Sequence, residues 1–244
     1  MPEGWEWRAL GDKTVLADIQ PGYACGQKDV ENGVPHLRMN NISKDAQLDY
    51  GLVRRIPRDI ADKAGKWLLP GDVIFNNTNS TELVGKTSLF QGWVERCAYS
   101  NHLTRLRTQP DTLTPEWLLY CLRELWLTKF FEINCKEFVG QSAFNTDKLK
   151  ELEIPVPSLP EQQRLVARIE AQTSRVEAMR NAQRELETEL RGILNGYYAE
   201  ICADAEWKPL AEAAPQVRRP VSVEAGKSYP ELGTRQKRRS LSHS

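Results

Sequence analysis

The sequence lacks a long apolar run. No stretch of about 18 apolar residues occurs along the chain, and its first residues carry no apolar signal segment. The five cysteines form no Cys-x-x-Cys pair and no cluster with histidine, which disfavours both a disulfide framework and a zinc site. We therefore expect a soluble, cytoplasmic protein with reduced thiols, no metal and no contact with a membrane.

Catalytic signatures are also missing. The chain has no Gly-x-Gly-x-x-Gly loop, no His-Glu-x-x-His helix and no Asn-Pro-Pro-aromatic motif of the kind that adenine methyltransferases use. Gly85-Lys86-Thr87 matches the end of a phosphate-binding loop, but Ser80 stands where that loop needs its first glycine. The sequence therefore predicts a protein without catalytic residues.

An overall excess of basic residues is absent as well. The formal net charge is zero, with eight Lys/Arg and three Asp/Glu from Lys208 onward, which leaves −5 for residues 1–207. Bulk electrostatic attraction to nucleic acid is thus excluded for the globular part of the chain. If the chain binds DNA, it must do so through a local patch.

Residues 1–157 mix short strand-like runs with turns, which predicts a globular domain of the α+β class. Expected strands occupy 33–42, 71–75 and 102–108, the last with the period-two alternation of a half-buried strand. We expect one helix over 114–135, with Thr114 as its N-cap and Pro115 at its first position.

A second, much longer helix is expected over 161–198, preceded by Pro160. At about 1.5 Å per residue it would be roughly 57 Å long. Its seam repeats in alternating steps of four and three residues, as in a coiled coil. Such a seam favours a partner helix, from the same chain or another, over packing on its own domain alone. The seam consists of Leu165, Ile169, Gln172, Val176, Met179, Gln183, Leu186, Leu190, Ile193 and Tyr197.

The end of the chain resembles its beginning. Trp207 and Leu210 have the spacing of Trp7 and Leu10, and a Pro-x-Leu step follows in both places. Residues 201–244 therefore read as the truncated start of a second repeat. Their polar, Pro-rich composition predicts poor order. A native basic tail is the alternative.

Several motifs together resemble the specificity subunit of type I restriction-modification enzymes. They are "GWEWRALGD", "PHLRMNNI", "LLPGDVIFNNTNSTELVGKTSLF" and the junction "LKELEIPVPSLPEQQRLVARIE" that leads into the long helix. The resemblance covers about residues 4–235. It implies a target-recognition domain over 1–157 and a spacer helix over 158–200 that packs antiparallel on a second helix.

The resemblance also implies partners. They are double-stranded DNA with a split site, a methyltransferase subunit that carries S-adenosylmethionine, and a restriction subunit; this chain itself would hold no cofactor. Because only one domain and one helix are complete, we expect a half-subunit that forms a homodimer. A coiled-coil adaptor that binds protein rather than DNA is the alternative.

DNA contacts need Arg or Lys for guanine, Asn or Gln for adenine, and short polar groups for phosphate. Turn chemistry is the alternative reading of each such stretch. We expect Asn76 to Ser80 to shape a turn or hold phosphate, and the loops around Asn101 and Gln141 to select bases. The candidates are Arg38, Asn40, Asn41, Arg54, Arg55, Asn76, Asn77, Thr78, Asn79, Lys86, Asn101, His102, Arg105, Gln141, Ser142, Asn145 and Lys148.

Overall fold

The computed structural model describes residues 2–26, 29–204, 208–209, 212 and 214. Contacts divide the chain into two compact units, Met1–Asn181 and Ala182–Ser244. None of the helices in the described ranges is long and apolar enough to cross a membrane. The expected second repeat lies largely outside the described residues.

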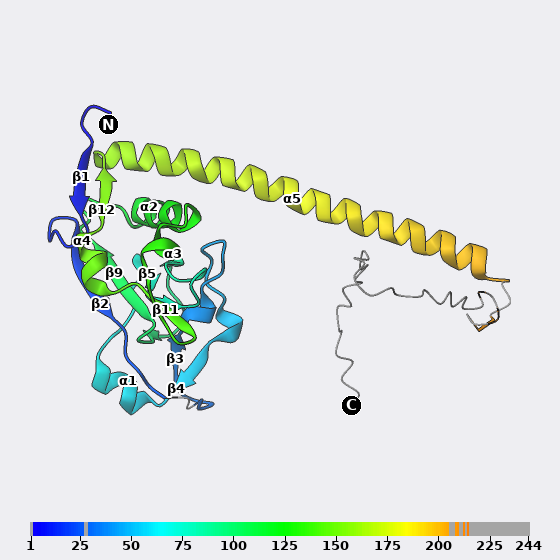
Figure 1. Cartoon of the computed structure of the whole chain (residues 1–244), viewed down its shortest axis with the longest axis horizontal. Coiled ribbons are helices and arrows are strands. Elements are labelled where there is room, and N and C mark those ends of the chain that lie inside the picture. The colour runs from blue at the N-terminus through cyan, green and yellow to red at the C-terminus, as the bar shows by residue number, and fades with distance from the viewer. Residues whose placement is uncertain (1, 27–28, 205–207, 210–211, 213, 215–244) are drawn as a thin grey trace, which may run out of the picture. The chain divides into compact units, whose positions relative to one another are not determined.

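A four-stranded antiparallel sheet forms the centre of the first unit, in the order β2-β9-β5-β7 (Figure 1). Side chains alternate between the two faces of a strand, so neighbouring residues of β5 enter different cores. Val73 and Phe75 pack in one apolar cluster, and Ile74 packs in another. The strands are β2 (Leu16–Pro21), β5 (Asp72–Asn76), β7 (Thr87–Phe90) and β9 (Leu103–Thr108).

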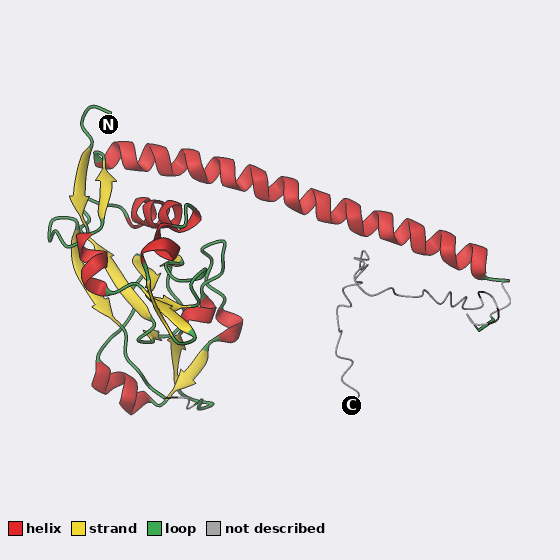
Figure 2. Ribbon diagram, in the orientation of Figure 1, coloured by secondary structure: helices red, strands yellow, loops and turns green. Residues whose placement is uncertain are grey.

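Helices α2 (Pro115–Leu127) and α3 (Phe130–Asn134) cover the first of these faces (Figure 2). Trp117, Leu118 and Leu122 of α2 are buried against it, and the ring of Phe131 lies 5.1 Å from that of Phe75.

Two smaller sheets and a strand pair complete the unit. In the order β4-β3-β8, β3 is antiparallel to β4 and parallel to β8. The order β10-β11-β6 is antiparallel throughout, and β1 pairs with β12. Their bounds are β1 (Glu6–Ala9), β3 (Val34–Leu37), β4 (Arg54–Ile56), β6 (Thr78–Asn79), β8 (Ala98–Tyr99), β10 (Lys136–Phe138), β11 (Gln141–Ala143) and β12 (Glu153–Val156).

The short helices lie in the connections. They are the single 3-10 turns η1 (Met39–Asn41) and η2 (Tyr50–Leu52), and the helices α1 (Arg58–Ala64) and α4 (Thr146–Glu151). The strand expected over 33–42 is therefore shorter than predicted, because η1 begins two residues after β3 ends.

Two further expectations need correction. The strand over 102–108 is buried on both faces, because its Leu106 and Leu103 enter cores on opposite sides of the sheet. The single helix over 114–135 is two helices, separated at Lys129, whose φ of 64° is left-handed and interrupts a right-handed helix. The predicted cap is confirmed: the Thr114 side chain accepts a hydrogen bond from the Trp117 N–H.

The long helix α5 runs from Leu159 to Cys202. It begins two residues earlier than predicted because Pro160 lies inside its first turn, where a missing N–H breaks no helical bond. Its buried Gln162 and Val166 hold the first two turns against the domain. Together, a mixed α/β domain and a long C-terminal helix confirm the predicted fold class.

Candidate nucleic-acid interface

Asn77 joins three segments that are far apart in the sequence. Its N–H donates to the His102 carbonyl at 3.1 Å, and its side-chain amide donates to the Asn101 carbonyl at 3.2 Å. Its own carbonyl accepts from the N–H of Phe144 at 3.0 Å. Three of the predicted polar stretches, around residues 77, 101 and 142, therefore meet at one residue.

Strand pairing strengthens this junction. In the β6–β11 ladder, Asn79 lies opposite Ser142 and Thr78 lies opposite Ala143. The hydroxyls of Thr81 and Ser142 are 2.7 Å apart and share a hydrogen bond. Asn76 to Ser80 was expected to form a turn, but its residues end one strand and form another, and the turn follows at 81–85.

Some of the candidate residues at this junction are accessible to solvent. We call this group the polar surface. Asn101 and Gln141 are exposed, whereas Asn77, Thr78, Asn79 and His102 are half-buried. Their amides, hydroxyl and imidazole are groups that can hydrogen-bond base edges or phosphate. Whether they contact DNA stays a prediction.

Other candidates belong to the framework. Asn41 is fully buried; its Oδ1 accepts from the Arg38 N–H at 2.8 Å and its Nδ2 donates to the Asp49 carbonyl at 2.9 Å. Arg105 is 6% exposed, pairs with Asp18 and donates to the Trp67 carbonyl at 2.7 Å. Neither side chain reaches the surface, so we remove both from the proposed DNA-contacting set.

Burial also removes Asn76 and Ser142 from that set, and it removes Lys86 from the polar surface. Lys86 is 7% exposed and its ammonium donates to the carbonyl of Ile42, so it is not a phosphate partner beside Asn76 on the polar surface. Asn76 is fully buried and Ser142 is 1% exposed. Sequence patterns missed these roles because polar side chains that bind ligands and those that satisfy buried backbone groups look alike.

Asn145 and Lys148 are exposed, but both have structural partners. The Asn145 side chain caps α4 by accepting from the Lys148 N–H at 2.8 Å, and the Lys148 ammonium donates to the Asn134 carbonyl at 3.0 Å. For Asn145, the alternative reading as turn chemistry accounts for the observed bond. The Lys148 charge remains at the surface, where a phosphate could reach it.

A separate basic group lies on β4 and directly after β3. Burial, and then the neighbouring charge of Arg54, lower the pKa of Arg38. Arg55 donates to the Glu95 carboxylate at 3.0 Å and to the Gly33 carbonyl at 2.8 Å, and the first contact raises its pKa. The charge of Arg55 is therefore already paired with Glu95. Arg38 and Arg54 are the stronger candidates in this group for a contact with phosphate. Asn40, beside them in the sequence, is exposed.

The sequence reading overlooked the tip of the β10–β11 hairpin. Val139 is fully exposed and Phe138 is 56% exposed, and Gly140 supplies the positive φ of the turn between the strands. An exposed aromatic side chain on the sheet that carries the polar surface is a further candidate contact. Only the strand pairing reveals it, because the hairpin has no sequence motif.

The predicted seam of α5 changes character along the helix. Leu165 and Ile169 are half-buried, and Leu165 packs with the domain core. From Val176 onward the apolar seam residues are exposed, by 46% at Val176 and 71% at Met179. Similar exposure is found for Leu186, Leu190, Ile193 and Tyr197.

These features are those of a globular α+β domain that continues into one long helix. The chain belongs to the type I restriction modification DNA specificity domain family, whose model matches residues 2–188. It is 34% identical over 168 residues to a protein of Methanocaldococcus jannaschii named as the specificity subunit of type I restriction enzyme MjaX. That match covers 68% of this chain and 38% of the relative.

Two further specificity subunits are similar to this chain. The StySPI type I restriction enzyme specificity subunit of Salmonella potsdam is 26% identical over 168 residues, which are 68% of this chain and 36% of that one. The crystal structure of the HsdS subunit from Thermoanaerobacter tengcongensis superposes with a TM-score of 0.58 at 26% identity, covering 79% of this chain and 43% of that chain. The chain thus spans less than half the length of these relatives.

Proposed function

We propose that this chain is the non-catalytic, sequence-specific DNA-binding subunit of a type I restriction-modification enzyme. It would direct a partner adenine methyltransferase and a restriction subunit to a split DNA site. The observation that carries the proposal is the meeting of three polar segments at Asn77, in a domain of the DNA specificity family.

Base choice would be made by the exposed members of the polar surface. The amides of Asn101 and Gln141 are able to form paired hydrogen bonds with adenine in the major groove. Asn77 has its side-chain N–H bonded to the Asn101 carbonyl, so it would support the surface for every DNA sequence. Arg38, Arg54 and Lys148 would position the DNA by binding its backbone phosphates.

The exposed seam of α5 would hold a second copy of the chain, with the two helices antiparallel. Apolar side chains that repeat at coiled-coil spacing and are 46% or more exposed, as they are from Val176 onward, are stabilised when a matching seam covers them. Two identical domains would then read identical half-sites, so the split site would be palindromic.

The partner methyltransferase would supply S-adenosylmethionine and the chemistry. This chain would contribute two parts to the complex. Its domain would bind DNA, and its long helix would set the distance between two such domains.

Selection from random-sequence duplexes tests the proposal. The full chain is mixed with the methyltransferase subunit of its enzyme, bound DNA is recovered and sequenced, and an enriched, palindromic split motif is expected. Binding without enrichment would instead favour the adaptor reading, in which the domain binds protein.

Light scattering at micromolar concentration, without methyltransferase, tests the dimer separately. We expect twice the chain mass, and the chain mass alone for Leu186→Glu, which puts a charge in the seam. Thr188→Glu is the matched control, because it adds the same charge outside the seam. The Thr188 hydroxyl donates a hydrogen bond to the Arg184 carbonyl of the same helix. A monomeric unmodified chain would contradict the dimer.

A further inference from the structure

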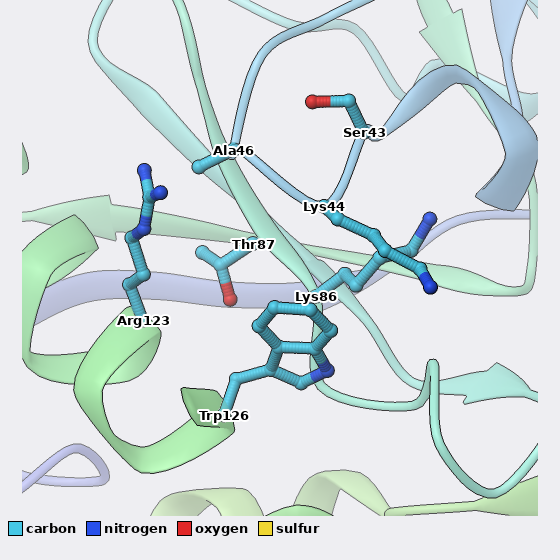
Figure 3. Close-up of a pocket in the computed structure, with 7 residues that line it drawn as sticks. All are labelled: Ser43, Lys44, Ala46, Lys86, Thr87, Arg123 and Trp126. Atoms are coloured by element: carbon cyan, nitrogen blue, oxygen red, sulfur yellow. The ribbon is translucent and has the colours of Figure 1, made fainter. Parts of the chain in front are cut away.

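A shallow recess lies between the loop after η1, strand β7 and helix α2 (Figure 3). The space between its side chains is about 170 Å³, a volume that includes open solvent. The recess encloses no cavity large enough for a water molecule. A ligand would therefore contact the ends of the side chains at the mouth. The recess is lined by Ser43, Lys44, Ala46, Lys86, Thr87, Arg123 and Trp126.

Two lysine ammonium groups, those of Lys44 and Lys86, belong to this recess. Lys86 is 7% exposed and its ammonium donates to the Ile42 carbonyl, which is neutral. Burial lowers the pKa of Lys86, and the charge of Lys44 lowers it further. Among the described residues neither lysine forms an ion pair. A buried charge next to a like charge is costly unless an anion is bound between them.

The nearby carboxylates have other partners. Asp45 accepts the Arg123 guanidinium, with its carbonyl at 2.9 Å and its Oδ1 at 4.0 Å. The Glu82 carboxylate accepts from the Ser80 hydroxyl at 2.9 Å, and it interacts with the Lys44 charge without forming an ion pair. Lys44 and Lys86 therefore leave the recess with a net positive charge.

A third donor stands beside the lysines. The indole N–H of Trp126 can only donate, and it has no hydrogen-bond partner in the described part of the chain. Figure 3 shows the Lys44 and Lys86 side chains extending the same way, with the Trp126 ring next to Lys86. The two lysine side chains and the Trp126 indole thus line the same recess.

We propose that Lys44, Lys86 and Trp126 form a binding site for a compact oxyanion, a phosphate group. Two ammonium charges match the charge of nearly two that a phosphate monoester carries near neutral pH, and its oxygens are strong acceptors. The site does not depend on the proposed function, because a free phosphate and a DNA backbone phosphate offer the same oxygens. It also gives a role to Lys86 that differs from a contact on the polar surface.

Inorganic phosphate is the first probe, added at constant ionic strength to the full chain labelled with ¹⁵N. Trp126→Phe identifies the indole resonance of Trp126 by its loss. We expect that resonance to shift in a saturable way, and Lys44→Gln to weaken the apparent affinity by about tenfold. The control Lys63→Gln removes an exposed charge from α1 and should leave the affinity unchanged.

The absence of a saturable shift at Trp126, or equal affinity in Lys44→Gln and Lys63→Gln, overturns the proposal. Lys86→Met provides a second check. It should abolish the shift while the remaining resonances keep their positions, and an unchanged affinity in the folded variant would also overturn the site.

Duplex DNA is the second probe and separates the two sources of phosphate. If a backbone phosphate occupies the site, Lys44→Gln weakens binding to every sequence and lowers the slope of affinity against salt by about one, whereas Lys63→Gln does neither. If phosphate binds but the two variants bind DNA equally, the site holds a free phosphate or a phosphate monoester. A failure of all variants to bind DNA counts against the proposed function only.

Discussion

Replacing Gln162 by leucine should destabilise the first unit strongly. Gln162 is fully buried at the start of α5, and its side chain makes three hydrogen bonds. Its Oε1 accepts from the Thr114 N–H at 2.9 Å, and its Nε2 donates to the carbonyls of Thr112 and Pro157, both at 2.8 Å. One side chain thus ties the long helix to the start of α2 and to the segment after β12.

Leucine has a similar volume but cannot form these bonds, so the variant leaves one N–H and two carbonyls without partners. A buried polar group that loses its partner costs about 1–3 kcal/mol, with carbonyls at the lower end. Summed over the three groups, we expect the free energy of unfolding to fall by about 3–5 kcal/mol.

Urea unfolding followed by tryptophan fluorescence measures this loss. Gln163→Leu is the matched control, because the neighbouring glutamine is exposed and the same substitution there should change stability by less than about 0.5 kcal/mol. A loss below about 1 kcal/mol for Gln162→Leu, or equal losses for both variants, would refute the reasoning that these bonds hold the helix.

Three further predictions follow from single positions. Asn77→Ala should weaken binding to all DNA sequences by a similar factor in a binding titration, since Asn77 supports the Asn101 loop; an altered sequence preference would contradict this. Burial lowers the pKa of His36 to about 4, below its unfolded value of 6.5, so the unfolded chain takes up a proton first and stability should fall as the pH drops from about 6.5 to 4. This shift is worth about 3 kcal/mol, and urea midpoints of His36→Phe should depend less on pH over that range; an unchanged dependence would count against it. Gly85→Ala should cost more in urea unfolding than Gly140→Ala: both have a positive φ, but the added methyl at Gly85 comes within 2.3 Å of the Phe131 ring, whereas the one at Gly140 meets nothing within 4 Å. Equal costs would mean that the ring moves aside.

Local chemistry allowed several elements to be predicted from the sequence. Thr114 followed by Pro115 has the composition of a helix start, and the structure places the cap there. The apolar run before Asn76 forms β5, and the seam spacing identified the long helix to within four residues at its C-terminal end. Each of these signals depends on residues close together in the chain, which is why it can be read without the fold.

The division of the polar candidates into surface and framework could not be predicted in this way. Asn41 and Asn101 are the same residue type in similar polar stretches, yet one is fully buried and the other is exposed. Arg105 has the composition of a DNA contact, but its charge is used by Asp18 and the Trp67 carbonyl. Burial and partners depend on segments that lie far apart in the sequence.

The sequence alone therefore determined the family, the class of fold and the repeat of the helix seam, because these depend on local motifs and on spacing along the chain. The tertiary structure decided which polar stretches meet at Asn77, and that Lys86 lies beneath the loop after η1 rather than on the polar surface. The physical reason is that a polar side chain is stabilised equally well by a ligand or by a buried backbone group, and only the folded chain brings that partner into reach.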